Sequence, residues 1–267
     1  MANRSQTINK PPSQRLLKLL NILAIFAWGI LLIKYAVTGQ YQLLIHPNYF
    51  YLMLVTSILL LAISIIQFSQ LLTQQTTALE NESHLTIFAP GVGSSLLLLS
   101  AIAGLLITPN VLSSQTALQR GMTETLPNTR YQPQSFLTQT QPQERSLIEW
   151  VRTLNAYPEP EAYTGQKAQI TGFTINLPEL PDNYLLLSRF VLTCCAVDAY
   201  PVFIPIELPD NSTSYPSDTW LKITGTMTPQ ILTISDRSDT PQEKRRLVLK
   251  ASKVTPIPTP KNPYNYQ

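Results

Sequence analysis

An uncharged apolar stretch at residues 49–72 constrains the fold of this chain more than any other feature. It opens with Tyr49, Phe50 and Tyr51 and continues through apolar side chains to Leu72. Water cannot satisfy backbone polar groups inside a bilayer, so an apolar run of about 20 residues crosses it as a helix. Aromatic residues at one end are typical of the membrane interface. We therefore predict that residues 49–72 span a membrane.

A second apolar segment, residues 16–37, lies nearer the amino terminus. Its uncharged centre is residues 19–33, and the long side chains of Lys18 and Lys34 can reach the interface from either end of it. A signal peptide is the alternative, since Arg15 and Lys18 precede the apolar core. No small-residue cleavage site follows, which favours a retained transmembrane anchor.

Residues 87–107 form a weaker third segment. Pro90, Gly91 and Gly93 interrupt its start, and the continuous apolar part, residues 96–107, is short. An interfacial or re-entrant segment is the alternative. We predict a third transmembrane helix here, and this prediction decides on which side of the membrane the rest of the chain lies.

The distribution of basic residues predicts the orientation. The loop at residues 38–48 has no Lys or Arg, whereas the amino-terminal tail carries Arg4, Lys10, Arg15 and Lys18. Positively charged flanks stay in the cytoplasm, so the amino terminus is expected there. With three spans, the chain after Pro109 is extracytoplasmic, and the protein is a multi-pass protein of the plasma (inner) membrane.

Composition divides the chain into three parts. Residues 1–109 are the membrane domain, residues 110–144 are rich in Ser, Thr, Gln and Pro and predict a flexible tether, and residues 145–267 form a separate domain. The net charge of +3 is small and the basic residues form no stripe, so we expect no nucleic-acid partner. The lipid bilayer is the expected environment of the first part.

The last domain has strand patterns after one short helix at residues 146–155. Alternation and turn residues predict strands at residues 166–175, 184–197, 202–208, 220–227, 231–235 and 247–254. Gly172 and Gly225 occupy matching places in two of these strands and indicate bends or bulges. Bent strands and a broken hairpin predict a small all-β, OB-like barrel, with a β-sandwich as the alternative.

The only two cysteines, Cys194 and Cys195, are adjacent, and Asp198 follows them. Thiolates bind soft metals, so these three residues are a candidate site for a soft metal ion such as zinc, or for a metalloid. Three ligands do not complete a tetrahedron, and another chain would have to supply the fourth. A strand places adjacent residues on opposite faces, so joint ligation requires a bulge. A vicinal disulfide and simple core packing are the alternatives.

Arg189 lies in the apolar run before the cysteines. A buried guanidinium requires a partner, for which Asp198 or a backbone carbonyl would serve, and an exposed edge position is the alternative. Both histidines, His46 and His84, lie in the membrane half, so no cysteine–histidine pair is available to the last domain. No catalytic apparatus is evident, and we expect a protein that is not an enzyme.

These residues resemble a known family. The pattern R-F-x-x-x-C-C-x-x-D-A at residues 189–199 is that of the YcgQ-like permease-subunit family. Residues 46–47 (HP), 109–121 (PNVLSSQTALQRG) and 262–264 (NPY) match as well, so the resemblance covers nearly the whole chain. Val197 departs from the small Ala expected at its position. The resemblance implies a membrane protein that works with a multi-span permease related to organoarsenical exporters, and it names no substrate.

Two functions follow as hypotheses. The first is a non-enzymatic accessory subunit of an integral-membrane permease, which binds or senses a soft metal or metalloid through Cys194, Cys195 and Asp198. The second is a membrane-anchored extracytoplasmic thiol redox protein that uses the same two cysteines. Disulfide exchange with a small thiol probe would distinguish them.

Overall fold

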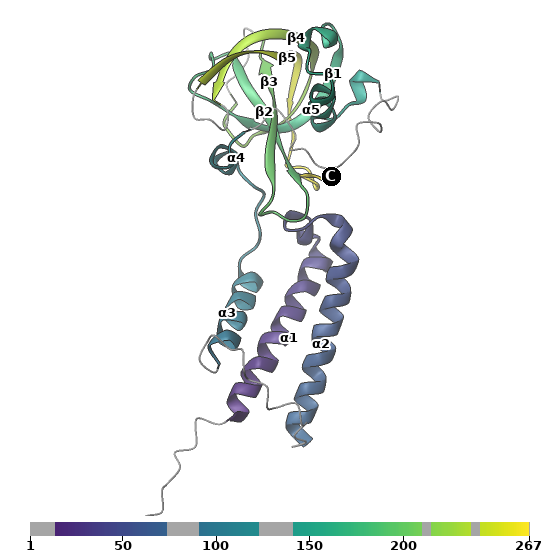
Figure 1. The fold of residues 1–267 in the computed structure, drawn as a ribbon, viewed down its shortest axis with the longest axis vertical. Helices are drawn as coiled ribbons and strands as arrows, with labels where there is room; N and C mark the ends of the chain where they lie inside the picture. Colours follow the sequence, from purple (N-terminus) through teal and green to yellow (C-terminus); the bar gives the residue numbers. More distant parts are fainter. Residues whose placement is uncertain (1–13, 74–90, 123–140, 210–214, 236–240, 267) are drawn as a thin grey trace, which may run out of the picture. The chain divides into compact units, whose positions relative to one another are not determined.

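The computed structural model describes residues 14–73, 91–122, 141–209, 215–235 and 241–266. The chain divides into two compact units, Met1–Pro109 and Asn110–Gln267 (Figure 1). The first is helical. The second contains the strands.

Three helices form the first unit: α1 (Gln14–Thr38), α2 (Phe50–Thr73) and α3 (Val92–Leu106). Two short 3-10 helices, η1 (Gln40–Leu43) and η2 (Pro47–Tyr49), join α1 to α2. The segments Arg15–Thr38 and Pro47–Thr73 are long and apolar enough to cross a membrane, whereas Val92–Leu106 is a shorter apolar helix. Part of the predicted third span, residues 87–90, lies outside the described residues.

Small residues and side chain-to-carbonyl hydrogen bonds hold α1 against α2. Ser57 donates to the carbonyl oxygen of Gly29 at 3.0 Å, and Ser64 donates to that of Ile22 at 3.2 Å. A later residue of α2 therefore meets an earlier residue of α1, and the two helices are antiparallel. Close approach at small residues is typical of helix packing in membranes.

Helix α3 follows α1 in the same direction. Trp28 donates from Nε1 to the carbonyl oxygen of Leu97 at 3.0 Å, and the ammonium of Lys34 donates to that of Leu105 at 2.8 Å. Because the last carbonyls of a helix lack intrahelical partners, a cation at this end is favourable. Large apolar side chains remain exposed on all three helices; those on α2 include Leu52, Val55, Ile58, Leu59, Ile63, Ile65 and Ile66.

The second unit contains six strands and short helices. The strands are β1 (Lys167–Ile175), β2 (Tyr184–Leu192), β3 (Tyr200–Glu207), β4 (Trp220–Ser235), β5 (Pro241–Pro256) and β6 (Asn265–Tyr266). The helical elements are α4 (Ser114–Arg120), η4 (Pro142–Glu144), α5 (Leu147–Ala156) and η5 (Pro160–Tyr163). Helix α5 begins with a capping box between Ser146 and Glu149.

The strands form one sheet in the order β1-β4-β5-β3-β2-β6, and β1 also pairs with β2. Most neighbours are antiparallel, whereas β3–β5 and β2–β6 are parallel. Helix α5 buries its apolar face against this sheet. The shared core includes Leu147, Trp150, Val151, Ile170, Leu185, Leu187, Val191, Ile204, Leu221, Ile223, Met227 and Leu249.

Both strand glycines lie where backbones approach closely. A Cβ at Gly172 would be 2.5 Å from the carbonyl oxygen of Ser188, and one at Gly225 would be 2.2 Å from that of Lys250. The β4–β5 register shifts between Thr224 and Gly225, which places an irregularity at the expected position.

Several boundaries differ from the sequence-based expectations, and β5 (Pro241–Pro256) is twice as long as the strand expected at residues 247–254. The strands expected at residues 220–227 and 231–235 form one strand, β4, that continues through Pro229. Beyond Thr226, β4 pairs only with β5, and a strand with one free edge tolerates proline. The strand expected at residues 184–197 ends at Leu192. The first part of the expected tether is also different, because residues 114–120 form α4 and contact the strands, whereas residues 123–140 lie outside the described part.

Candidate functional site

The two cysteines lie in the loop of residues 193–199 between β2 and β3. The expected strand ends at Leu192 because the next backbone N–H groups have another acceptor. The carboxylate of Asp198 accepts the N–H of Cys194 at 2.7 Å and that of Cys195 at 3.1 Å. A side chain that binds neighbouring backbone N–H groups competes with strand pairing. We call residues 193–199 the cysteine loop.

Asp198 organises the cysteine loop. Its carboxylate also accepts a hydrogen bond from the hydroxyl of Thr193, and its own N–H donates to the carbonyl oxygen of Cys195 at 3.1 Å. Partial burial by itself would raise the pKa of Asp198. The hydrogen bonds from Cys194, Thr193 and the Cys195 amide outweigh that effect and lower the pKa to about 2. Asp198 is therefore ionised at neutral pH.

The thiols are accessible and close together. Cys194 is exposed and Cys195 is partly exposed, and both are free cysteines. The Cys194 thiol donates to the Cys195 sulfur, and the two sulfur atoms are 3.6 Å apart. A hydrogen bond to Asp198, followed by the hydrogen bond to Cys195, raises the pKa of Cys194 to about 12. Cys194 is thus a protonated thiol at neutral pH.

The geometry suits one tetrahedral soft ion. The candidate ligand atoms of Cys194, Cys195 and Asp198 all lie within 4.8 Å of one another. Zinc–sulfur bonds of about 2.3 Å at a tetrahedral angle place two sulfur atoms about 3.8 Å apart. The observed separation of 3.6 Å is close to this value, and no strand bulge is needed because the cysteines lie in a loop. The carboxylate of Asp198 already accepts several hydrogen bonds, so the two sulfur atoms are better ligands for the ion than this carboxylate is.

Arg189 has backbone carbonyls as partners, which is one of the two alternatives expected. Its guanidinium donates to the carbonyl oxygen of Asn262 at 2.7 Å and to that of Pro263 at 3.4 Å. The guanidinium also lies over the Trp220 ring, 5.7 Å from its centroid. Arg189 therefore fixes the carboxy-terminal segment beside β2.

Sequence reasoning did not assign roles to two residues that support this region. Arg120 donates to the carbonyl oxygens of Ala196 and Ala199 in the cysteine loop. The Tyr264 hydroxyl accepts the backbone N–H of Leu112 at 2.9 Å. Three stretches that carried the family resemblance, residues 109–121, 189–199 and 262–264, therefore converge at the same end of β2. The resemblance was the signal that could have identified them.

Two family models together match almost the whole chain. The DUF1980 N-terminal domain matches residues 20–123, and the DUF1980 C-terminal domain matches residues 115–267. The chain belongs to the DUF1980 family. This is the YcgQ-like family, and the Cys194–Cys195 motif is present. No curated protein matches the chain.

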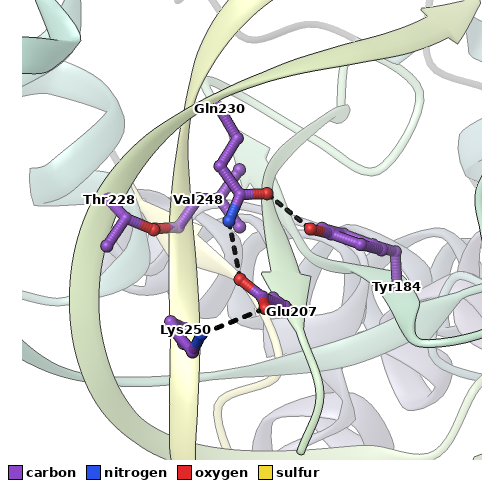
Figure 2. A network of polar contacts seen from close by, with 6 residues as sticks. All are labelled: Tyr184, Glu207, Thr228, Gln230, Val248 and Lys250. Carbon is purple, nitrogen blue, oxygen red and sulfur yellow. Dashed lines mark hydrogen bonds and ion pairs between the residues drawn. The ribbon is translucent and has the colours of Figure 1, made fainter. Parts of the chain in front are cut away.

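This DUF1980 chain has a second polar cluster, away from the cysteines in sequence (Figure 2). The amide of Gln230 accepts from the Tyr184 hydroxyl at 2.5 Å and donates to the Glu207 carboxylate at 2.6 Å. Lys250 is 3.4 Å from the same carboxylate. These residues come from β2, β3, β4 and β5. Desolvation raises the pKa of Tyr184, and the Glu207 charge adds to this.

The second cluster joins strands rather than forming a candidate site. Its hydrogen bonds connect four strands near the short parallel pairing of β3 with β5, in which Glu207 lies opposite Lys250. The side chain of Lys250 is 64% exposed, so its ion pair contributes little to stability. Among the residues that the structure describes, the group of Cys194, Cys195 and Asp198 is the cluster with metal-ligand chemistry.

Proposed function

We propose that this DUF1980 chain is a non-enzymatic accessory subunit of a multi-span membrane permease, and that Cys194 and Cys195 bind a soft metal ion or metalloid. The separation of 3.6 Å between two accessible sulfur atoms carries this proposal. Thiolates select soft ions over Mg²⁺ and Ca²⁺. Asp198 holds the loop in which both sulfurs face the same ion, and Arg189 fixes the neighbouring chain end. The permease partner rests on the family resemblance.

The proposal includes three membrane spans. Helix α3 follows α1 from the hydrogen bond between Ser94 and Asn21 to that between Lys34 and the Leu105 carbonyl, over most of the length of α1. Its 15 residues measure about 22 Å, and residues before Val92 would have to complete the crossing of a core about 30 Å thick. The parallel course of α1 and α3 supports a crossing in the same direction.

The proposal also includes an OB-like barrel. Each of the strands β1 to β5 pairs with two others, and the pairings form the cycle β1-β2-β3-β5-β4-β1. A sheet whose pairings close in a cycle is closed as in a barrel, and the part of β4 beyond Thr226, which pairs only with β5, lies outside this cycle. Close backbone approaches at Gly172 and Gly225 support tight bending of β1 and β4.

The thiol redox protein is the alternative, and the environment of Cys194 disfavours it. Redox-active cysteines are thiolates of lowered pKa near positive groups or helix amino termini. Cys194 is instead beside the Asp198 carboxylate, which raises the pKa of the thiol to about 12. A metal ion can displace the thiol proton, because metal binding to cysteine is coupled to deprotonation.

Zinc binding by the full chain in detergent tests the metal site. The experiment measures Zn²⁺ affinity by competition with a chromogenic chelator under reducing conditions, and compares the wild type with the Cys194→Ser, Cys195→Ser double variant. The control for a small side-chain change elsewhere is Ser252→Ala, at an exposed position on β5. Stoichiometric binding that only the double variant loses supports the proposal. A wild type that binds neither Zn²⁺ nor arsenite contradicts it.

Co-purification tests the partner. The full chain, co-expressed with a candidate multi-span permease and solubilised in mild detergent, is expected to elute with that permease. If the chain elutes alone and instead exchanges disulfides rapidly with a small thiol probe, the redox alternative replaces the accessory-subunit proposal.

A further inference from the structure

Helix α4 contacts the cysteine loop through the guanidinium of Arg120. Nη1 of Arg120, the last residue of α4, donates to the carbonyl oxygen of Ala196 at 2.9 Å and to that of Ala199 at 2.6 Å. Charge-assisted hydrogen bonds of this kind are stronger than neutral ones. These two carbonyls bracket Asp198, the residue that organises the loop.

The backbone of the cysteine loop is held on two sides. The N–H groups of Cys194 and Cys195 donate to Asp198, whereas the carbonyl groups of Ala196 and Ala199 accept from Arg120. Apart from an isolated β-bridge at Cys195, the loop lies outside β2 and β3, and these side chains supply hydrogen bonds that hold its backbone. Arg120 and Asp198 therefore hold the same short loop.

Helix α4 is itself anchored to the β unit. Ser113 caps its start by accepting the N–H of Thr116, and Gly121 ends it with a φ of 76°. Ser114 donates from its backbone N–H and from its hydroxyl to the carboxylate of Asp218, at 2.5 Å and 2.9 Å. These contacts place Arg120 at a fixed position beside the cysteine loop.

Helix α4 comes directly after the helical unit in the sequence. The helical unit ends at Pro109, and α4 begins at Ser114, so only residues 110–113 join them. Along the chain, α4 is therefore the first element of the second unit after α3, and Arg120 joins it to the loop that carries the cysteines.

We propose that Arg120 is a positioning residue through which α4 sets the distance between the two cysteine sulfurs. Arg120 thereby couples soft-ion binding to the segment that leaves the membrane unit. This inference rests on the proposed function for its ligand. Because coupling between two sites is reciprocal, an ion bound by the cysteines must also stabilise α4 in its docked position.

The test uses the full chain in detergent and two replacements of Arg120. Arg120→Met keeps much of the apolar stem and removes the donors, whereas Arg120→Lys restores a cation that can donate to two carbonyls. Lys253→Met, which removes an exposed positive charge on β5, is the control for net charge. The measurements are Zn²⁺ affinity by chelator competition and amide hydrogen exchange of residues 193–199 and of α4, with and without Zn²⁺.

We expect Arg120→Met to weaken Zn²⁺ binding about 10–100-fold, the usual cost of removing a group that orients metal ligands. Arg120→Lys should recover most of the affinity, and Lys253→Met should have the affinity of the wild type. Without the ion, exchange of residues 193–199 should be faster in Arg120→Met while exchange of β4 is unchanged. Zn²⁺ should slow the exchange of α4 in the wild type and not in Arg120→Met.

Two results would overturn the inference. One is an Arg120→Met variant with wild-type affinity and wild-type exchange in the cysteine loop. The other is a wild type in which Zn²⁺ binds without changing the exchange of α4. A wild type that binds no soft ion at all refutes the proposed function and the coupling with it, whereas the exchange of residues 193–199 without ion still reports whether Arg120 positions the loop.

Discussion

The carboxylate of Asp198 accepts the backbone N–H of Cys194 at 2.7 Å and lies beside the thiol of the same residue. One side chain thus has two effects on one cysteine. It bends the backbone so that the two sulfurs are neighbours, and its negative charge opposes ionisation of the thiol. A soft ion bound here would replace the thiol proton and neutralise the charge that Asp198 brings to the loop.

Replacing Asp198 should make Cys194 more reactive. In a Cys195→Ser background, which leaves one thiol, Asp198→Asn keeps the side-chain size and removes the charge. Because the hydrogen bond to Asp198 is the largest cause of the raised pKa of Cys194, the pKa of the thiol should fall toward its ordinary value of 9.0. The thiolate fraction at pH 8 should therefore rise by about tenfold for each unit by which the pKa falls. The measurement is the rate of alkylation by iodoacetamide between pH 6 and pH 11.

The raised pKa of Cys194 also predicts how the rate of its alkylation depends on pH. A raised pKa means that alkylation of the Asp198-containing protein stays slow at neutral pH and accelerates at a higher pH than alkylation of the Asp198→Asn protein. Cys194→Ser in the same background identifies any labelling that does not come from Cys194. Equal rates with Asp198 and with Asn at this position would contradict the assigned effect of the carboxylate.

Two buried tyrosines should respond differently to loss of the hydroxyl group. The Tyr200 hydroxyl is buried and has no hydrogen-bond partner among the described residues, so Tyr200→Phe should leave the free energy of unfolding unchanged or raise it. The Tyr264 hydroxyl accepts the N–H of Leu112, so Tyr264→Phe should cost about 1 kcal/mol. Denaturant unfolding of the full chain in detergent, followed by tryptophan fluorescence, compares them.

These tyrosines also predict a loss of stability in alkali. Burial raises the pKa of Tyr200 from 10.0 to about 12 and raises that of Tyr264 as well. Between these values the unfolded chain releases a proton that the folded chain retains. The stabilisation is therefore complete below about pH 10 and is lost as the pH rises toward 12. Tyr200→Phe should make this decline less steep, and an unchanged slope would contradict the assignment.

The second polar cluster, in which Gln230 bonds both Tyr184 and Glu207, allows two variants to be compared in stability. Gln230→Leu removes the amide between the Tyr184 hydroxyl and the Glu207 carboxylate and leaves both without that partner, which should cost about 1–3 kcal/mol. Lys250→Met removes only a largely exposed ion pair and should cost less than about 1 kcal/mol. Urea unfolding of both variants provides the measurement. A cost of Lys250→Met that equals that of Gln230→Leu would contradict this ranking and mean that the ion pair stabilises the fold as much as the Gln230 hydrogen bonds do.

Periodic features of the sequence predicted the elements well. The apolar runs located α1 and α2 within two residues at each end, alternation located β1, and apolar residues spaced on one helical face located α5. These elements form because one face or the whole of each is apolar, and that property is local. Alternation could not show that β4 continues through Pro229, because that depends on which neighbouring strands β4 pairs with.

The candidate site was less predictable than its residues. Cys194, Cys195 and Asp198 were identified from their types and spacing, but the expected strand would have placed the cysteines on opposite faces. The loop arises from hydrogen bonds to Asp198, whose competition with strand pairing is not visible in residue type alone. Arg120 lies more than 70 residues before its partners, Ala196 and Ala199, and only the fold brings them together.

Membrane topology is the prediction with the widest consequence. A reporter fused after Gln267 should report an extracytoplasmic location, because α1 and α3 run in the same direction and the basic tail predicts a cytoplasmic amino terminus. A fusion after Thr73, at the end of α2, is the matched control and should report the cytoplasm, since α2 is antiparallel to α1. Paired alkaline phosphatase and green fluorescent protein fusions measure both positions. A cytoplasmic signal from both fusions would show that α3 does not cross, and it would place the cysteine loop in a reducing compartment, where free thiols persist and a disulfide does not.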